Sequence, residues 1–259
     1  MFDFLQRGLF SYLFPTFPSE KAWLYYLTYI GFAVAIIAVG YLLGSLNASM
    51  VVSKLLHHDD IRKHGSGNAG LTNMLRTYGK GAAGLTLLGD ILKTAIAILF
   101  AGVLFGFGYV GGISTNLGFC YVAGLFAVVG HIFPIYYKFK GGKGVLATAT
   151  MALILTPLPF AVLLLIFVII VWITRYVSLG SIAGAIFYPV SIFVYFKVFF
   201  AEGTPIPLFA AVSTVILAIL IVWCHRGNIE RISNRTERKL SFKKKPEIEA
   251  LPEDDDEAV

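Results

Sequence analysis

The sequence predicts an all-α, polytopic integral membrane protein with seven transmembrane helices, Gly-rich cytoplasmic loops and a short interfacial N-terminal segment. Of its 259 residues, 57% are hydrophobic and only 14% are charged, whereas soluble domains carry about 25% charged residues. The apolar residues gather in runs of roughly 20, the length that a helix needs to cross a bilayer. The basic residues gather between these runs, which is typical of cytoplasmic loops and not of nucleic-acid binding.

The apolar runs define seven helices within one transmembrane domain over residues 23–240. The run at 144–174 is too long for one span and too short for two full spans. Its Thr-Pro-Leu-Pro sequence at 156–159 predicts two short helices that meet at the prolines. The seven spans are expected at 24–46, 82–101 and 117–137, as the two halves of 144–174, and at 182–199 and 207–224.

The two ends of the chain differ from this domain in composition. Residues 1–22 are rich in aromatic side chains, and we expect them to form a short amphipathic helix on the membrane surface. Residues 241–259 are charged and end in EDDDEAV. Because such a segment cannot bury enough apolar surface to fold, it is predicted to be disordered.

Lysine and arginine predict the orientation, since cytoplasmic loops are enriched in them. Basic residues occur in the loops at 47–81, 138–143 and 175–181 and again after the last span, whereas the loops at 102–116 and 200–206 have none. Seven spans place all the basic loops on one side. The N-terminus is therefore expected outside and the C-terminus in the cytoplasm.

The most informative motif is GSGNAGLTNMLR at residues 65–76. Gly65, Gly67 and Gly70 fit the spacing G-x-G-x-x-G, but the polar KLLHHDDIRKH before them is not the buried strand that a dinucleotide site requires. Glycines still let a backbone approach an anion closely, and successive N–H groups at a helix start form an anion-binding concavity. The motif therefore predicts a phosphate site at the membrane.

Three further polar segments lie on the predicted cytoplasmic side. They are GHIFPIYYKFKGGKGV at 130–145, RYVSLGS at 175–181 and HRGNIERI at 225–232. KGGKG is not a P-loop, because the P-loop spacing and its Ser or Thr are missing, yet its glycines expose amides and Lys143 supplies a point charge. Four such segments on one face favour an anion-binding site over separate turns and topology signals.

Several other polar residues leave alternatives open. Asp90 and Lys93 lie three residues apart within a span, which makes them functional candidates, although mutual neutralisation would also explain both. His131 fits a structural hydrogen bond as well as catalysis. The HHDD run at 57–60 is not expected to bind metal, because adjacent side chains point apart. We see no Gly-x-Ser-x-Gly elbow and no carboxylate cluster for Mg²⁺, so the pattern suits an electrophile that is already activated.

The four segments, in this order, resemble the motifs of the bacterial acyl-phosphate-dependent glycerol-3-phosphate acyltransferases, the PlsY family. The resemblance extends from about Gly40 to Lys239 and includes the D-x-x-K of Asp90 and Lys93. It implies a seven-span enzyme of the bacterial inner membrane, with its active site facing the cytoplasm. That enzyme transfers a fatty acyl group from acyl phosphate to the 1-hydroxyl of glycerol 3-phosphate. The products are lysophosphatidic acid and phosphate, in the first step of phospholipid synthesis.

The resemblance also implies partners and site residues. It implies membrane lipid as a partner, a functional link to an acyl-carrier-protein:phosphate acyltransferase, and no cofactor, metal ion or nucleic acid. The phosphate of acyl phosphate would lie in a cradle made by Ser66, Gly67, Asn68, Gly70, Thr72, Asn73, Gly141 and Gly142. Glycerol 3-phosphate would be bound by Arg76, Lys143, Ser181, His225 and Asn228, which form the catalytic set together with Ser66.

The chain departs from the family pattern in three places. GKGVLAT replaces GKGVAT and moves Thr148 one position later, and HRGNI replaces HRENI through Gly227. The later glycine of the family's G-x-E segment is Arg235 here, while Glu237 remains. The residues alone also admit a transporter of a phosphorylated solute or a lipid-binding scaffold. The lack of a visible internal repeat speaks against the transporter.

Overall fold

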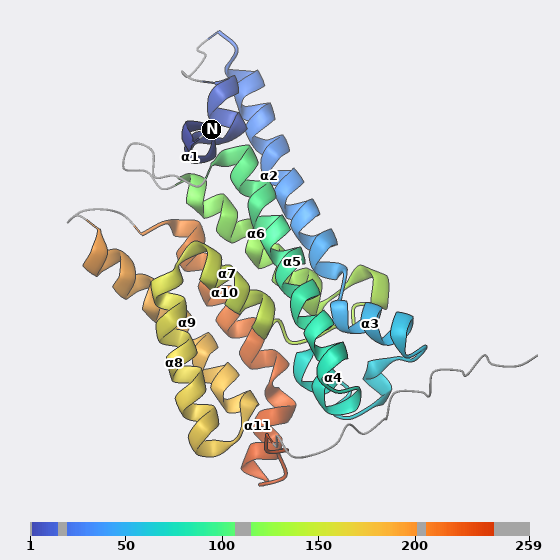
Figure 1. Cartoon of the computed structure of the whole chain (residues 1–259). Coiled ribbons are helices and arrows are strands. Elements are labelled where there is room, and N and C mark those ends of the chain that lie inside the picture. Colours follow the sequence, from blue (N-terminus) through green and yellow to red (C-terminus); the bar gives the residue numbers. More distant parts are fainter. Residues whose placement is uncertain (1, 15–19, 107–114, 201–205, 241–259) are drawn as a thin grey trace, which may run out of the picture.

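The computed structural model describes residues 2–14, 20–106, 115–200 and 206–240, and its regular elements in these ranges are all helices (Figure 1). The prediction of an all-α protein is therefore confirmed, while the tail predicted to be disordered lies outside the described residues. The α-helices are α1 (Phe2–Leu13), α2 (Ala22–Ser45), α3 (Ala48–Leu56), α4 (Leu71–Thr77), α5 (Lys80–Phe105), α6 (Thr115–Ile132), α7 (Val145–Leu155), α8 (Pro157–Thr174), α9 (Val177–Phe199), α10 (Leu208–Cys224) and α11 (Arg226–Ser233).

The structure does not confirm the predicted number of seven spans. In the described ranges, five helical segments are long and apolar enough to cross a membrane, and they contain α2, α5, α6, α8 and α9. A sixth span results if α10 and α11, which are bent by 52° to each other, are counted together. The remaining predicted span is α7, whose 11 residues reach only about 16 Å, roughly half of the hydrocarbon thickness.

The break between α7 and α8 explains why this span is short. Pro157 is the first residue of α8, a position where its missing N–H group leaves no helical hydrogen bond unmade. In a continuous helix the same residue would remove a bond and clash with the preceding turn. The expectation of two helices that meet at the prolines is confirmed.

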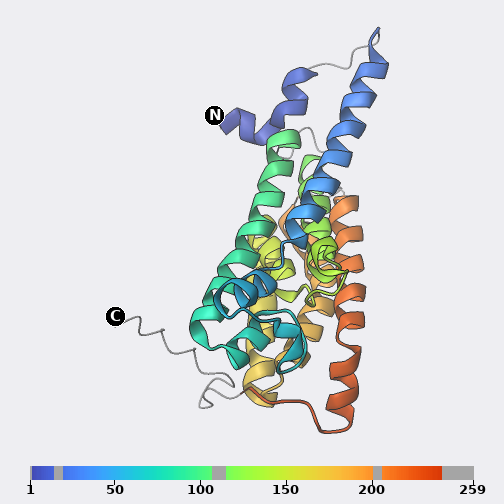
Figure 2. The same cartoon turned by 90° about the vertical axis from the view of Figure 1, so that its right-hand side faces the viewer.

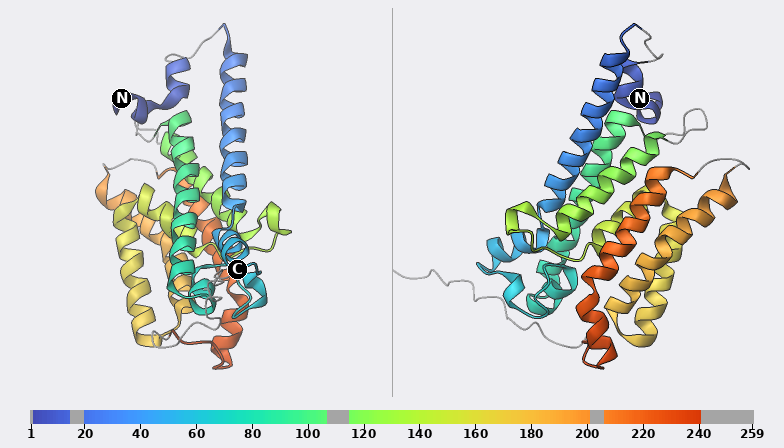
Figure 3. Two further views of the ribbon diagram at one scale, coloured as in Figure 1. Left: turned by 45° about the vertical axis from the view of Figure 1, so that its right-hand side comes forward. Right: turned by 180° about the vertical axis from the view of Figure 1, so that it is seen from behind.

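Helix α6 is the centre of the bundle. It packs against α2, α5, α7 and α10, and its Cys120, Tyr121 and Val128 are fully buried. Figure 3 shows α2, α5 and α6 side by side, with α8, α9 and α10 beside one another in the other part of the bundle. The short helices α3, α4 and α11 gather at one end (Figure 1), where the four polar segments of the sequence also lie.

Helix α1 lies at the opposite end of the bundle (Figure 2). It is kinked at Gly8 and buries Phe10 among aromatic rings. The ring centroid of Phe10 lies 5.0 Å from that of Tyr25, 5.5 Å from Tyr29 and 5.6 Å from Phe105. Helix α1 therefore packs against α2 and α5, while the position of the N-terminal segment at the membrane surface stays a prediction.

Candidate active site

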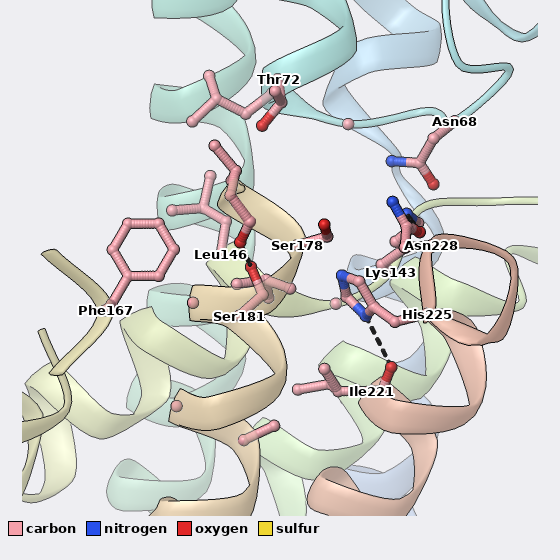
Figure 4. A pocket seen from close by; sticks show the side chains of 18 of the residues that line it. Asn68, Thr72, Lys143, Leu146, Phe167, Ser178, Ser181, Ile221, His225 and Asn228 are labelled. Carbon is pink, nitrogen blue, oxygen red and sulfur yellow. Dashed lines mark hydrogen bonds between the residues drawn. The ribbon is translucent and has the colours of Figure 1, made fainter. Parts of the chain in front are cut away.

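A cavity of about 580 Å³ lies where the four polar segments meet. One end is polar and is lined by Asn68, Lys143, His225 and Asn228, whereas the other end is lined by apolar side chains of α7, α8 and α9. Figure 4 shows Phe167 and Leu146 on one side of the cavity and the polar group on the other. One hollow therefore combines surfaces suited to an anion and to a hydrocarbon chain.

Ten of the thirteen site residues expected from the sequence line this cavity. They are Ser66, Asn68, Gly70, Thr72, Asn73, Arg76, Lys143, Ser181, His225 and Asn228. Gly67 instead lines an open depression that adjoins the cavity through Ser66, Asn68, Lys143 and Asn228.

The two expected glycines of the KGGKG loop have a different place. Gly141 donates its N–H to the carbonyl of Ile132 at 3.1 Å, and Gly142 donates to the carbonyl of His131 at 3.1 Å. Because both amides are already bonded to the end of α6, they are not available to a phosphate in this arrangement. These glycines instead fold the loop closely against α6, so that Lys143 reaches the cavity.

Asn73 has a supporting position beneath the glycine-rich loop. Its Oδ1 accepts the N–H of Ser66 at 2.9 Å, and its Nδ2 donates to the carbonyls of His64 at 3.0 Å and Ile61 at 3.2 Å. The residue is only 2% exposed. Its amide therefore orders the loop, and the loop presents other groups to a ligand.

Lys143 belongs to a chain of hydrogen bonds at the polar end of the cavity. Its Nζ donates to Oδ1 of Asn228, and Nδ2 of Asn228 donates to Glu237 Oε1 at 2.6 Å. Ser178 Oγ donates to the same carboxylate oxygen at 2.8 Å, and Arg231 Nε donates to Oε2 at 2.8 Å. Glu237 thus ties α9, α11 and the segment after α11 together around Asn228.

Ser178 and Glu237 were not among the residues expected in the site. Ser178 belongs to the RYVSLGS segment, but sequence alone did not separate its hydroxyl from that of Ser181. The signal for Glu237 was an acidic residue within a basic segment. Ser181 itself donates to the carbonyl of Val177 at 2.9 Å and keeps its side chain at the cavity wall (Figure 4).

The electrostatics of the polar end follow from burial. Burial lowers the pKa of Lys143 to about 8, with the charge of Arg231 acting in the same direction and Glu237 opposing it. Burial, followed by the charge of Lys143, lowers the pKa of His225 to about 4. Burial opposes ionisation of Glu237, yet the hydrogen bonds from Asn228, Ser178 and Arg231 hold its pKa below the ordinary value. At neutral pH the site therefore holds a charged Lys143 and a neutral His225.

The ring of His225 is oriented by its own helix. Its Nδ1 lies 2.7 Å from the carbonyl of Ile221 (dashed in Figure 4), and since a carbonyl can only accept, Nδ1 donates the bond. In the neutral ring this leaves Nε2 as an acceptor. His225 can therefore receive the hydrogen of a hydroxyl group that enters the cavity.

Comparison with known proteins decides the family. The model of the family described as glycerol-3-phosphate acyltransferase matches residues 34–235 of this chain. The chain belongs to this family. The resemblance drawn from the four motifs is thereby confirmed. Residues 1–33 and 236–259 lie outside the match, so Glu237 falls just beyond its end.

Bacterial relatives in this acyltransferase family match most of the chain. The glycerol-3-phosphate acyltransferase of Syntrophomonas wolfei is 40% identical over 209 residues, which cover 81% of this chain and 97% of the relative. That of Halalkalibacterium halodurans is 43% identical over 206 residues, which cover 79% of this chain and 93% of the relative. The chain is thus related to these acyltransferases over nearly their whole length.

Two crystal structures of PlsY (YgiH), an integral membrane glycerol 3-phosphate acyltransferase, have a similar fold. The glycerol 3-phosphate form matches with a TM-score of 0.69 and 32% sequence identity. The match covers 81% of this chain and 96% of the PlsY chain. The lysophosphatidic acid form matches with a TM-score of 0.66 and 30% identity, and the match covers 81% of this chain and 95% of the PlsY chain. This chain is therefore a multi-pass membrane protein of the acyltransferase family.

We expect His225→Asn to keep its turnover within about tenfold of the wild-type protein, because we expect His225 to orient the hydroxyl and not to act as the general base. Loss of a general base would cost roughly 100- to 10,000-fold. The pH profile of kcat/KM between about pH 5 and 7 should also be the same in the wild-type protein and in His225→Asn. A pKa of about 4 leaves the imidazole neutral in that range, so only the second ionisation of the substrate phosphates, at about pH 6, shapes the profile. Initial rates of acylation of glycerol 3-phosphate at each pH measure both. A larger loss in folded His225→Asn, together with an acidic limb of the wild-type profile that is missing from the variant, would identify His225 as the base.

Proposed function

We propose that this protein transfers a fatty acyl group from acyl phosphate to the 1-hydroxyl of glycerol 3-phosphate, giving lysophosphatidic acid and phosphate. The observation that carries the proposal is the single cavity with a cationic, polar end and an apolar end. The reaction brings together two phosphate groups and one hydrocarbon chain, and such a cavity offers a surface for each. A transporter of a phosphorylated solute would not require the apolar end.

The acceptor is assigned to the polar end of the cavity. Lys143 and Arg76 supply positive charge for the phosphate of glycerol 3-phosphate, and Asn228 orients Lys143. His225 orients the 1-hydroxyl by accepting a hydrogen bond from it, and Ser181 lines the same cavity on the wall of α9. Glu237 acts through Asn228 and is a positioning residue.

The donor phosphate is assigned to the glycine-rich loop. Within the described residues, the N–H groups of Asn68, Leu71 and Thr72 donate to no protein atom in the structure, and they lie next to the exposed Ser66 and Gly67. Free amides of this kind bind phosphate oxygens. The acyl chain then extends along the apolar wall formed by α7, α8 and α9.

The chemistry needs little from the protein beyond position and charge. Acyl phosphate is a mixed anhydride with a good leaving group, so the hydroxyl oxygen can attack the carbonyl carbon directly without an acyl-enzyme. The new C–O bond forms as the bond to phosphate breaks, and a phosphate group takes the hydroxyl proton. Cations fixed near the reacting groups stabilise the charge that moves onto the leaving phosphate.

The decisive experiment supplies purified protein in lipid nanodiscs with acyl phosphate and glycerol 3-phosphate. Mass spectrometry should detect lysophosphatidic acid with acyl phosphate but not with acyl-CoA or acyl-loaded carrier protein. EDTA should leave the rate unchanged, because the described residues contain no cluster of three or more His, Cys, Asp or Glu side chains placed to hold a metal ion. Equal product from acyl-CoA would refute the assigned donor, and uptake of solute into proteoliposomes without product would favour the transporter.

The proposed reaction implies an enzyme that supplies the donor and a location for this protein in the cell. A donor of this kind must be made by an enzyme that moves acyl groups from carrier protein to phosphate, which is the functional link that we propose. We also place the protein in the bacterial inner membrane, with the cavity facing the cytoplasm. In support, the polar end of the cavity is formed by segments that contain Arg76, Lys143, Arg175 and Arg226, and cytoplasmic ends of spans are rich in such residues.

The wall of α9 predicts the chain-length limit. Ser181, Gly184, Ala185 and Tyr188 share one face and line the cavity, and no atom lies within 4 Å of a Cβ built on Gly184. We expect Gly184→Leu to lower kcat/KM for a long donor about tenfold more than for a short one, because the new side chain fills the cavity about one helical turn below Ser181. Rates with C8 and C16 acyl phosphates measure this change in preference.

Gly84→Leu is the matched control, since Gly84 also has open space around its Cβ position but lies on the exposed face of α5 outside the cavity. Its preference for donor length should equal that of the wild-type protein. Losses of the same size for both donors in Gly184→Leu would show that the acyl chain does not run along α9.

A further inference from the structure

Three buried polar side chains form a cluster where α5 meets α6, and we call Asp90, Lys93 and His131 the charge triad. They are 1%, 4% and 4% exposed. Lys93 Nζ lies 2.7 Å from Asp90 Oδ1 and 2.9 Å from His131 Nδ1, which is itself 3.4 Å from Asp90 Oδ1. Two of the three, Asp90 and His131, also line the cavity.

The ammonium group of Lys93 has a third partner outside α5 and α6. It donates to the carbonyl of Leu46 at 3.2 Å, just after α2 ends. The ion-pair partner Asp90 and the hydrogen-bond partners His131 and Leu46 therefore bring three different parts of the chain to one ammonium group. If Lys93 served only to neutralise Asp90, the contacts to Leu46 and His131 would not be needed.

One arm of this arrangement leads to the glycine-rich loop. Leu46 is followed by Asn47, which is fully buried and caps α3 by accepting the N–H of Met50 at 3.2 Å. The Nδ2 of the same Asn47 donates to the carbonyl of Ala69 at 3.3 Å. Ala69 lies within the loop that we assign to the donor phosphate.

The other arm leads to the loop that carries Lys143. The carbonyl of His131 accepts the N–H of Gly142, and the ring atom Nε2 of His131 packs against the same glycine so closely that a Cβ there would overlap it. That Cβ would also lie 2.6 Å from the carbonyl oxygen of Ala69. Gly142 is therefore held between the ring of His131 and the glycine-rich loop, next to Lys143.

We infer that the charge triad is a positioning device that holds the two substrate loops at a fixed separation. Lys93 fixes the glycine-rich loop through Leu46 and Asn47, and it fixes the ring of His131 that supports Gly142 and Lys143. The inference rests on the proposed function, in which one loop receives the donor and the other contributes to the acceptor site. None of the three residues needs to touch a substrate for this role.

The test separates positioning from simple neutralisation of charge. The double variant Asp90→Asn, Lys93→Met removes both charges, so no buried charge is left uncompensated, but it breaks the contacts to Leu46 and His131. We expect KM and the directly measured Kd for glycerol 3-phosphate to rise about tenfold, since a misplacement of about 1 Å costs up to 100-fold. Wild-type values in the folded double variant would overturn the inference.

A matched control and a coupling measurement complete the test. Thr94→Val changes a buried residue one position from Lys93 whose hydroxyl bonds only within α5, at 2.9 Å to the carbonyl of Asp90, and it should bind like the wild-type protein. In a Lys143→Ala background, the double variant should weaken binding less than twofold further, because effects that act through one contact do not add. Full additivity would mean that the triad does not act through Lys143.

A substitute variant and a test of the wild-type protein keep the outcomes distinct. If the double variant does not fold, His131→Asn takes its place, because it keeps both charges but withdraws the ring from Gly142. Unchanged binding in folded His131→Asn would again overturn the inference. A wild-type protein that neither binds glycerol 3-phosphate nor acylates it would refute the proposed function instead, whatever the variants do.

Discussion

Gly67→Val should reduce turnover more than 100-fold. Gly67 has a φ of +71° in the glycine-rich loop, and this backbone conformation costs an L-residue about 1–2 kcal/mol, with a branched side chain worse than alanine. The loop can relieve the strain only by turning its backbone, which moves the amides beside it away from the donor phosphate. Initial rates of lysophosphatidic acid formation from acyl phosphate measure the loss.

Ser66→Ala is the comparison for this variant, because it removes one hydroxyl from the same exposed loop and leaves the backbone unchanged. Loss of one neutral hydrogen bond costs about 0.5–1.5 kcal/mol, so its rate should stay within roughly tenfold of wild type. Ser66→Ala should melt near the wild-type temperature, since position 66 is exposed, whereas the backbone strain in Gly67→Val should lower its melting temperature by only a few degrees. Full activity of Gly67→Val would show that the loop does not form the phosphate cradle.

Lys143→Ala should raise KM for glycerol 3-phosphate roughly ten- to a hundredfold, with a smaller change in kcat. A charge-assisted hydrogen bond to phosphate is worth about 1.5–3 kcal/mol, and Lys143 is the cation at the polar end that Asn228 orients. Lys143→Arg should restore only part of the affinity, because a planar fork does not replace a point charge in a site built around Asn228. Steady-state kinetics at varied concentrations of glycerol 3-phosphate measure KM for the wild-type protein, Lys143→Ala and Lys143→Arg.

The pH dependence gives Lys143 a second test. Because its pKa in the folded protein is about 8, well below the ordinary value near 10.5, the ammonium form dominates below pH 8 and is lost above it. KM for glycerol 3-phosphate should therefore rise by up to about tenfold per pH unit above 8, and Lys143→Arg should remove this rise. A wild-type KM that is constant to pH 10 would show that Lys143 does not bind the phosphate as a cation.

The sequence predicts the location of the site better than the tasks of its residues. Glycine spacing and lone cations identify the loops, because those residue types carry the chemistry wherever the chain folds. The sequence does not show which N–H groups are already bonded. Gly141 and Gly142 were therefore expected to bind phosphate, although they bond to α6, and Asn73 was expected in the cradle that it supports from beneath.

The lengths of the individual helices could not be predicted for a similar reason. Hydropathy shows the length of an apolar run and the proline shows where it breaks, so both α7 and α8 were expected. It does not show that α7 has only 11 residues of helix or that α10 and α11 meet at 52°. Glu237 was missed as a site residue because its partner Ser178 lies 59 residues away in the sequence, and only the fold brings the two together.

The apolar wall of the cavity, formed by α7, α8 and α9, bears on how a substrate would arrive. Leu164 of α8 lines the cavity and is 45% exposed, so under the proposed function we expect the apolar end to open sideways toward the surrounding bilayer. A donor that is dissolved in the membrane can diffuse in two dimensions and enter laterally, and its tail need never cross water. Its encounter rate is then governed by its mole fraction among the lipids rather than by its bulk molarity, whereas the acceptor arrives from solution.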